Sequence, residues 1–378
     1  MQVSDLRIAL TSGNYNYTRD GANKSLNRLV GYLLKQGAAV RVYSPVVDNP
    51  AFEATGDLVG TPAVPIPLRP EYRIPLGFGN AVRPDVDAFR PNMIHVSAPE
   101  FLGHSALRYG IAHNLPVVAS VHTRFDTYLS YYHLGLFEPL MTGMLRRFYR
   151  RCDAIVTPSE SMAEVLRAQR MNDDVGIWSR GVEFEIFNPA KRSLDWRREH
   201  GIADGDVVVG FTGRLVLEKG IDVFGDVITE LRRRGVPHRV LIVGEGPARE
   251  TFAQAVPDAI FAGFQSGPDL GRAVASMDIL LNPSVTETFG NVTLEAMASG
   301  VAVVGADATG TSSLVVDGVT GRLIEPRNIA AYADAIAHFV ENTDARIAAG
   351  TAGAKAAEPY SWDRINGTLA AKYLEVVQ

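Results

Sequence analysis

The chain has 378 residues, of which 46% are hydrophobic and 21% are charged. A domain usually spans about 150 residues, so this length predicts two domains, and the composition excludes a disordered or fibrous chain. The 37 lysines and arginines are outnumbered by 42 acidic residues, which gives a net charge of −5. Because proteins that hold nucleic acid through its phosphates usually carry a basic excess, we expect no nucleic-acid partner.

Cysteine content and hydropathy indicate where such a protein works. Cys152 is the single cysteine, so neither an internal disulfide nor a cysteine-rich zinc site can form. The first ten residues do not show the basic start and long apolar core of a secretory signal, and no apolar run approaches about 18 residues. We therefore expect a soluble protein of the reducing cytoplasm.

The first part of the chain alternates short apolar runs with segments of helical spacing. Leu6–Leu10 predicts a strand, Thr11–Gly21 a long loop and Ala22–Gln36 a helix. The proline-rich segment Thr61–Pro75 is expected to be a surface loop without regular structure. Further strands are expected at Val40–Tyr43, Met93–Val96, Pro116–Val121 and Ala154–Thr157.

A second series of the same kind follows a segment, Gly181–Ser193, whose weak periodicity is typical of a linker. Alternating strands and helices in both halves predict two doubly wound α/β domains with parallel sheets, facing each other across a central cleft. The expected strands of the second series are Val207–Thr212, Arg239–Val243, Ala259–Ala262, Ile279–Asn282 and Val301–Gly305. The expected helices are Lys219–Arg234, Pro247–Ala255, Pro268–Ser276 and Gly290–Ser299.

One predicted helix, Leu134–Cys152, is strongly amphipathic. One interpretation is a core-facing helix with a solvated basic side, and the other is a basic face that touches an anionic membrane surface or an acidic acceptor. The apolar face carries Phe137, Met141, Met144, Leu145, Phe148 and Tyr149. The basic face carries Arg146, Arg147, Arg150 and Arg151.

The segment Ser284–Gly300, SVTETFGNVTLEAMASG, carries the densest chemical signal. It follows a predicted strand and begins a helix near Gly290, and a helix N-terminus presents unpaired backbone N–H groups that can hold a phosphate. A glycine there also lets a ligand approach the backbone closely. Glu287 precedes this helix and Glu295 lies inside it, eight residues later. The two carboxylates are therefore expected to contact opposite ends of one ligand, with its diphosphate between them.

A second signal is the segment Gly213–Gly220, directly after the first strand of the second series. Arg214 and Lys219 at this strand end would neutralise a diphosphate and stabilise its charge as it leaves. For the pair alone, a surface turn with two solvated cations remains an alternative. A phosphate-binding helix in the same domain favours the first interpretation.

These two motifs together resemble the glycosyltransferases of family 4, which have the two-domain GT-B fold and transfer a sugar from a nucleotide diphosphate donor with retention. The marks of the family are the two glutamates with Phe289-Gly290 between them and the G-R-x-x-x-x-K-G segment. The resemblance covers nearly the whole chain. Leu6–Tyr43 is similar to the family's opening unit, with Asp20-Gly21 where a Gly-Gly pair is more common.

The resemblance implies a role for each matching residue of the second half. Arg214 and Lys219 would bind the donor diphosphate, Glu287 the hydroxyls of the transferred sugar, and Glu295 those of the ribose. No metal and no other cofactor is implied. Gly21 and the residues Phe289 to Val292 are expected to contact the donor through backbone N–H groups. The full set of expected donor contacts is Gly21, Arg214, Lys219, Gly246, Phe264, Glu287, Phe289, Gly290, Asn291, Val292 and Glu295.

The resemblance also assigns residues of the first half. His122 ends a strand and matches the family's cleft histidine, although a lone histidine is more often structural. With Arg214, Lys219 and Glu287 it completes the set expected to act in catalysis, and it is not assigned as a general base. The segment after it resembles the subset of mannosyl- and hexosyltransferases that act on glycolipids, which places Arg124 and Tyr128 on the acceptor side.

The resemblance implies four segments along the chain. Residues 1–180 form the acceptor-side domain, 181–193 the linker, 194–358 the nucleotide-sugar domain, and 359–378 a helix that crosses back to the first domain.

Two short motifs suggest other chemistry. Asp85-Val86-Asp87 fits an Asp-x-Asp metal motif, but it follows Arg83-Pro84, so we expect a solvated turn and no bound metal. Gly244-Glu245-Gly246 imitates a dinucleotide fingerprint, but Arg249 occupies the position of the third glycine.

The sequence thus predicts a retaining enzyme that moves a hexose, mannose or glucose-type, from a GDP- or UDP-sugar to a hydroxyl of a lipid or glycoconjugate. We expect it to work in the cytoplasm, with peripheral contact to the inner membrane face through the basic helix. Two alternatives stay open, a nucleotide-sugar epimerase of the same fold and a non-catalytic two-lobed binding protein.

Overall fold

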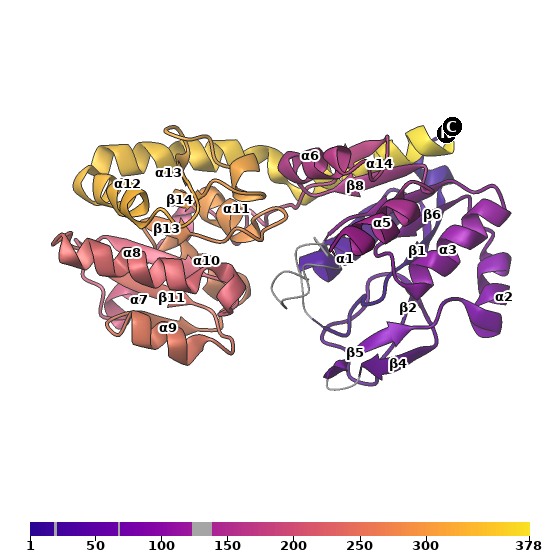
Figure 1. Cartoon of the computed structure of the whole chain (residues 1–378), viewed down its shortest axis with the longest axis horizontal. Helices are drawn as coiled ribbons and strands as arrows, with labels where there is room; N and C mark the ends of the chain where they lie inside the picture. Colours follow the sequence, from indigo (N-terminus) through magenta and orange to yellow (C-terminus); the bar gives the residue numbers. More distant parts are fainter. Residues whose placement is uncertain (19–20, 67–68, 123–137) are drawn as a thin grey trace. The chain divides into compact units, whose positions relative to one another are not determined.

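The computed structural model describes residues 1–18, 21–66, 69–122 and 138–378, and only the backbone of residues 69–71. The chain divides into two compact units (Figure 1). Unit 1 contains Met1–Arg180 and Trp362–Gln378, and unit 2 contains Gly181–Ser361. No described helix is both long and apolar enough to cross a membrane.

Unit 1 is built on a seven-stranded sheet in the order β3-β2-β1-β6-β7-β8-β9, and all its strand pairs are parallel. The central strands are continuous apolar runs because helices bury both of their faces. The strands are β1 (Arg7–Thr11), β2 (Ala39–Ser44), β3 (Asp57–Gly60), β6 (Met93–Val96), β7 (Val117–Ser120), β8 (Ala154–Thr157) and β9 (Val175–Ile177). The helices are α1 (Gly21–Lys35), α2 (Gly79–Phe89), α3 (Phe101–Ala112), α5 (Glu138–Tyr149), α6 (Glu160–Ala168) and α14 (Trp362–Val377), with the short η1 (Val3–Asp5).

Unit 2 is built on a six-stranded parallel sheet in the order β12-β11-β10-β13-β14-β15. Its strands are β10 (Val208–Thr212), β11 (Arg239–Val243), β12 (Ile260–Gly263), β13 (Ile279–Asn282), β14 (Ala302–Ala306) and β15 (Gly321–Ile324). Its helices are α7 (Leu194–Glu199), α8 (Ile221–Arg233), α9 (Arg249–Ala255), α10 (Gly267–Ala275), α11 (Asn291–Ala298), α12 (Ile329–Glu341) and α13 (Thr343–Ala357). Short 3-10 helices are η3 (Pro189–Lys191), η4 (Leu217–Lys219), η5 (Thr311–Ser313) and η6 (Glu358–Tyr360).

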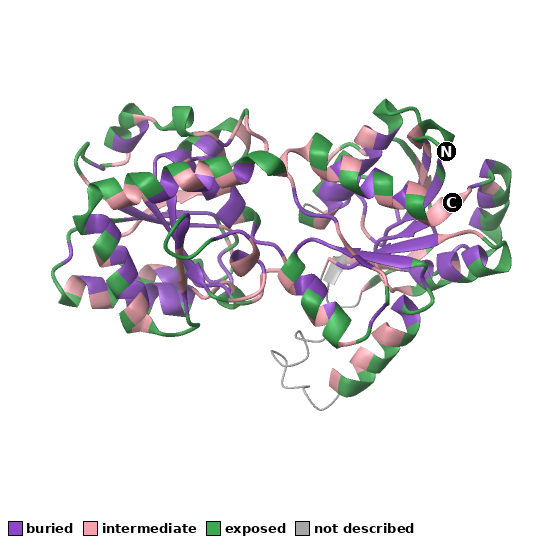
Figure 2. Cartoon of the chain, turned by 90° about the horizontal axis from the view of Figure 1, so that it is seen from above, coloured by how far each residue is buried: buried purple, intermediate pink, exposed green. Residues whose placement is uncertain are grey.

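The expectation of two doubly wound domains with parallel sheets is confirmed. In each unit the central strands of the sheet are buried, while the helices expose one face and bury the other (Figure 2). The segment Gly181–Ser193 packs with unit 2, where Val182 and Phe187 are part of the apolar core.

Helix α14, at the end of the chain, is part of unit 1 (Figure 1). Its Tyr373 hydroxyl lies 2.6 Å from Nδ1 of His95, a fully buried residue of β6. Burial lowers the pKa of His95 to about 3, so the ring is neutral and can serve as a hydrogen-bonding partner without a charge. The Trp178 indole also donates to the Asn366 side chain at 3.3 Å. Helix α14 therefore contributes to the core of unit 1.

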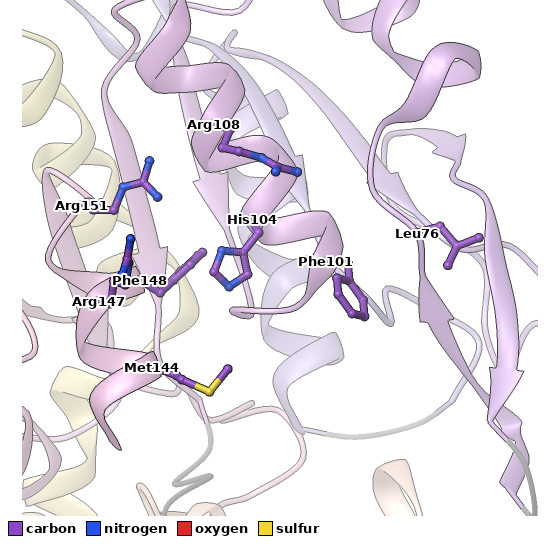
Figure 3. A pocket seen from close by; sticks show the side chains of 8 residues that line it. All are labelled: Leu76, Phe101, His104, Arg108, Met144, Arg147, Phe148 and Arg151. Atoms are coloured by element: carbon purple, nitrogen blue, oxygen red, sulfur yellow. The ribbon is translucent and has the colours of Figure 1, made fainter. Parts of the chain in front are cut away.

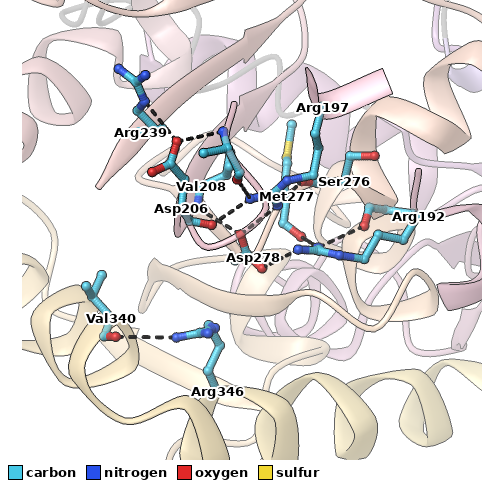
Figure 4. A network of polar contacts seen from close by, with 12 residues as sticks. Arg192, Arg197, Asp206, Val208, Arg239, Ser276, Met277, Asp278, Val340 and Arg346 are labelled. Carbon is cyan, nitrogen blue, oxygen red and sulfur yellow. Dashed lines mark hydrogen bonds and ion pairs between the residues drawn. The ribbon is translucent and has the colours of Figure 1, made fainter. Parts of the chain in front are cut away.

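A buried polar network lies in unit 2 where α7 and the loop after η3 meet the sheet (Figure 4). Arg197 is completely buried and donates to Asp278 at 3.0 Å and to the Asp206 carbonyl at 2.6 Å. Asp278 also accepts from Arg192 at 2.8 Å and from the backbone N–H of Val208 at 2.9 Å. The network ties these segments to the beginnings of β10 and β13, and it satisfies a charge that would otherwise be costly to bury.

Two sequence expectations were wrong about unit 1. Thr61–Pro75 is not an irregular loop but contains the antiparallel strands β4 (Ala63–Ile66) and β5 (Arg69–Pro75). In a two-stranded ribbon each strand has one unpaired edge, so prolines are tolerated there. Asp85 and Asp87 are not in a turn but inside α2.

Helix α2 forms despite its internal Pro84 because Val82, Val86 and Phe89 bury one face of it. The two acidic side chains have structural partners, which the motif alone does not reveal. Asp85 pairs with Arg41 at 3.1 Å, and Asp87 accepts from the Tyr109 hydroxyl at 2.7 Å.

Helix α5 corrects the expected amphipathic pattern of Leu134–Cys152, whose residues 134–137 lie outside the described part. Phe148 and Tyr149 are buried as expected, but Met144 is 61% exposed. Arg146 is half-buried and donates through Nε to the Gln169 carbonyl at 2.8 Å. Arg146 is thus held by the protein, and Met144 lies on a surface that the helical periodicity assigns to the core.

Candidate active site

The sheet of unit 2 reverses its direction of growth between β10 and β13. In a doubly wound sheet the loops that follow two such strands run in opposite directions and leave a crevice, which is where ligands bind. The loop after β10 is Gly213–Gly220, and the loop after β13 leads to α11. Both sequence motifs therefore belong to the same crevice.

Lys219 and Glu287 meet at this crevice, although 68 residues separate them in the chain. The Lys219 Nζ lies 2.5 Å from Oε1 of Glu287, and the two side chains are 30% and 16% exposed. Arg214 comes from the same loop as Lys219, is exposed, and forms no ion pair with any residue that the structure describes. One cation of the motif is thus paired with a motif glutamate, while the other faces solvent.

Neighbouring loops fix the position of Glu287. The Thr286 hydroxyl donates to the Glu218 carbonyl at 3.2 Å, which joins the loop after β13 to the loop after β10. Gly310, in the loop after β14, packs so closely against Glu287 and Phe289 that a Cβ atom would overlap them. A larger residue there would displace the Glu287 loop.

The start of α11 has no side-chain cap. Gly290 precedes the helix with φ of 91° and has no side chain to cap the first amides. Phe289 is buried against Tyr360, with ring centroids 5.8 Å apart, so only its backbone can reach a ligand. Inside the helix, Thr293 accepts from the Asn282 side chain at 3.0 Å, which attaches α11 to the end of β13. Asn291 is exposed, and Val292 and Glu295 are half-buried on this helix.

The loops after β10, β11 and β12 are interlocked. The Leu215 N–H donates to the Glu245 carbonyl at 3.0 Å, and the Gly244 N–H donates to the Gly263 carbonyl at 2.8 Å. A Cβ atom on Gly246 would overlap the Leu215 carbonyl, so glycine is required for this close approach. The next residue after β12, Phe264, has a side chain that is 66% exposed.

The sheet of unit 1 also reverses its direction of growth, between β1 and β6. The residue that lies there, Glu100, was not predicted from the sequence. Glu100 follows β6, and its carboxylate lies directly against Gly13, in the loop after β1, where a Cβ atom would overlap it. Burial raises the pKa of Glu100 to about 7, although the Gly13 N–H lowers it somewhat. A glutamate placed directly after a predicted strand was the available signal. Gly21 lies at the start of α1 and is exposed.

His122 follows β7 in unit 1, and its Nδ1 lies 2.9 Å from a guanidinium nitrogen of Arg180. Because a guanidinium only donates, Nδ1 accepts and the ring proton resides on Nε2. Burial, and then the charge of Arg180, lower the pKa of His122 well below its ordinary value. Such a ring is neutral and a weak proton acceptor, which fits its not being assigned as a general base. Arg124, Tyr128 and Asp20 lie outside the described residues.

Comparisons with known proteins agree with this arrangement. The family model described as "Glycosyltransferase Family 4" matches residues 19–186, and the one described as "Glycosyl transferases group 1" matches residues 206–342. A GDP-mannose-dependent alpha-mannosyltransferase of Mycobacterium tuberculosis is 31% identical over 89% of this chain and 88% of the relative. One from Corynebacterium glutamicum is 26% identical over 99% and 90%.

Solved structures support the fold. Sucrose-phosphate synthase from Thermosynechococcus elongatus superposes with a TM-score of 0.78 over 97% of this chain and 98% of that chain, at 18% identity. The Anabaena protein HepE, solved in complex with UDP and glucose, gives 0.71 over 98% and 99%, at 19% identity. The expected GT-B fold is confirmed. The chain belongs to the family 4 glycosyltransferases and is itself a glycosyltransferase.

Proposed function

We propose that the chain transfers mannose from GDP-mannose to a hydroxyl of a lipid or glycoconjugate acceptor, with retention of the anomeric configuration. The observation that carries the proposal is the Lys219–Glu287 pair, where the second sheet reverses its strand order, in the crevice whose other loop leads to the uncapped start of α11. It combines a cation and amide donors, which suit a diphosphate, with a carboxylate, which suits sugar hydroxyls.

The ion pair suggests how donor binding proceeds. A diphosphate that reaches the crevice competes with Glu287 for Lys219, since both are anions within reach of one ammonium group. Glu287 then has a free oxygen for the hydroxyls of the sugar. Arg214, which has no acidic partner among the described residues, adds a second positive charge. Both cations and the first amides of α11 stabilise the diphosphate as it leaves.

Other parts of the donor are assigned to neighbouring loops. We infer that Glu295, on α11, bonds the ribose hydroxyls and that the exposed Phe264 ring stacks on the base, near Gly246. GDP-mannose is proposed because relatives named as GDP-mannose-dependent alpha-mannosyltransferases match along nearly the whole chain. No metal is required by this arrangement, because the cations and the helix start supply the positive charge.

The acceptor is assigned to unit 1. In a doubly wound sheet ligands bind in the crevice at the reversal, here between the loops after β1 and β6. Glu100 follows β6 and His122 follows β7, so both lie at this edge of the sheet. Arg124 and Tyr128 are proposed acceptor contacts from the family resemblance. The protein is proposed to act in the cytoplasm at the inner membrane face, which Arg147 and Arg151, at the end of α5, would contact.

Release of the nucleotide diphosphate, measured with GDP-mannose, GDP-glucose, UDP-glucose and UDP-galactose, tests the proposal. We expect GDP-mannose to give the highest kcat/KM, and NMR of the product to show an α-linkage. Lys219→Ala should lower kcat/KM by about 100-fold, the usual effect of removing one charge-stabilising group from a transition state. Lys355→Ala, which removes an exposed lysine of α13, should leave turnover unchanged. Unchanged turnover in Lys219→Ala would refute the assignment.

A further inference from the structure

A pocket of about 420 Å³ lies in unit 1, between α3 and α5 (Figure 3). Its volume is within the range of small-molecule sites, about 300–1,000 Å³. Nothing in the proposed transfer reaction uses it. It is lined by Leu76, Phe101, His104, Arg108, Met144, Arg147, Phe148 and Arg151.

The lining residues follow helical spacing on both helices. Phe101, His104 and Arg108 lie on one face of α3, and the α5 residues recur at the same intervals up to Arg151, just past its end. Both helices connect parallel strands, so they run in the same direction. In each the apolar residue comes first and the arginine last. The pocket therefore has an apolar end and a cationic end, as Figure 3 shows for Met144 opposite Arg108 and Arg151.

The cationic end lacks a counter-charge. Within the described parts of the chain, no carboxylate pairs with Arg108, Arg147 or Arg151. His104, Arg108 and Arg151 line the same pocket (Figure 3). Burial lowers the pKa of His104, and the charges of the two arginines lower it further. Phe148 closes the base of the pocket against His104, with ring centroids 4.7 Å apart. Three adjacent positive charges without an acid are suited to an anion.

The apolar end is exposed to water. Phe101 is 66% exposed, Met144 61% and Leu76 56%, and Leu140, one turn before Met144 on α5, is 64% exposed. Large apolar side chains gathered on a surface mark a binding site for an apolar partner. A free phosphate or sugar phosphate would match the arginines but would leave these side chains in water. The combination fits an amphiphile with one anionic end.

We propose that this pocket binds an anionic membrane phospholipid, with its phosphate between Arg108 and Arg151 and its acyl chain against Phe101 and Met144. The inference rests on the part of the proposed function that places the enzyme at a membrane surface. It identifies this pocket as the place where the protein contacts the membrane. Arg146, which is held by Gln169, and Arg150, which does not line the pocket, are excluded from it.

The direction of the pocket determines which side of unit 1 faces the lipid. Phe101 directly follows Glu100, so the apolar end lies at the edge of the sheet where the acceptor is proposed to bind. Arg108 is seven residues further along α3, about 10 Å away. This spacing matches an interfacial element that inserts apolar side chains about 5–10 Å below the phosphates. The acceptor edge of unit 1 would then face the bilayer, which is where a lipid-linked hydroxyl would be found.

Sedimentation of the full-length protein with vesicles tests the proposal. We expect binding to vesicles of phosphatidylcholine with phosphatidylglycerol and little binding to phosphatidylcholine alone. Arg151→Gln should lower the partition coefficient about fivefold, the usual effect of one basic residue near an anionic surface, and Arg108→Gln/Arg151→Gln more than 20-fold. Arg150→Gln removes the same charge from the neighbouring position outside the pocket and should have little effect.

A second pair of variants tests the apolar end at constant charge. Phe101→Ser should lower binding about tenfold, whereas Ile111→Ser, an exposed apolar residue near the other end of α3, should not. Each protein is first checked for unchanged thermal unfolding.

Three results would overturn the inference. Equal loss in Arg150→Gln and Arg151→Gln would indicate diffuse attraction rather than a pocket. Complete competition by inorganic phosphate at constant ionic strength, with no effect of Phe101→Ser, would indicate a site for a free anion. No binding to any vesicle would exclude a lipid ligand. Stabilisation of the wild-type protein by GDP, measured without vesicles, tests the donor half separately, so failure of one proposal is distinguishable from failure of the other.

Discussion

Glu100 of unit 1 is an acidic side chain whose protonation depends on the fold. Its pKa rises from 4.5 to about 7 because the carboxyl group is buried, and the hydrogen bond from the Gly13 N–H offsets only part of this rise. The folded state therefore holds a proton that the unfolded chain releases near pH 4.5, and stability falls as the pH rises through this window, by up to about 3 kcal/mol. We expect Glu100→Gln to unfold at a higher temperature than the wild type at pH 8.5 and at a similar temperature at pH 4.5.

The matched control for this prediction is Glu53→Gln, which neutralises an exposed glutamate of the same unit. Its melting temperature should follow that of the wild type at every pH. If Glu100→Gln behaved in the same way, the carboxylate would be solvated, and the crevice between the loops after β1 and β6 would be more open than the structure has it.

How far single residues could be predicted depends on whether their role is local. Lys219 and Glu287 were found because each belongs to a short motif at a strand end. Their ion pair was not foreseen, since it joins loops that only the strand order brings together. Glu100 was missed for the same reason, because its carboxylate lies against Gly13, a residue of a different loop.

At the scale of elements, the start of α11 makes a prediction about Gly290. Its φ of 91° is strained for any other residue, but a Cβ there has no neighbour closer than 3.5 Å, so Gly290→Ala should fold with a loss of about 1 kcal/mol. The strain would turn the first amides of α11, and we expect GDP binding, measured by calorimetry, to weaken several-fold.

Gly318→Ala is the control that separates the effect of backbone strain on stability from the effect of Gly290→Ala on GDP binding. Gly318 has a φ of 74°, open space around it, and a position in the turn before β15. The two variants should lose similar stability, and only Gly290→Ala should lose affinity for GDP. Equal affinities in both would mean that the amides of α11 do not hold the ligand.

Elements were predictable where a single strand or helix carries its own pattern. The buried strands at the centre of both sheets are apolar runs, and these were located to within one or two residues, as at β13. The outer strands β3, β9 and β15 were not predicted, because each is only partly buried and lacks a continuous apolar run. The ribbon of β4 and β5 was missed because prolines suppress a strand prediction, whereas the free edge of a two-stranded ribbon tolerates them. Helix α2 was missed because Pro84 suggests a turn, whereas the burial of Val86 and Phe89 stabilises the helix.

At the scale of the whole molecule, each unit has its own core and can be perturbed separately. Two buried tyrosines provide the comparison. Tyr373 of α14 bonds to His95 in unit 1, while the Tyr332 hydroxyl, in the core of unit 2, has no hydrogen-bond partner among the described residues. The same change to phenylalanine therefore has opposite expected effects.

Tyr373→Phe leaves a buried ring nitrogen of His95 without its partner and should destabilise unit 1 by about 1–3 kcal/mol. Tyr332→Phe removes an unsatisfied buried hydroxyl and should leave unit 2 unchanged or stabilise it by about 1 kcal/mol. Hydrogen exchange read by mass spectrometry assigns each effect to its unit. Tyr373→Phe should accelerate exchange in β6 and β8, and Tyr332→Phe should not accelerate it in β10 or β14. Unchanged exchange of β6 in Tyr373→Phe would show that the Tyr373–His95 hydrogen bond does not stabilise the first sheet, and that α14 acts on this unit through its apolar packing alone.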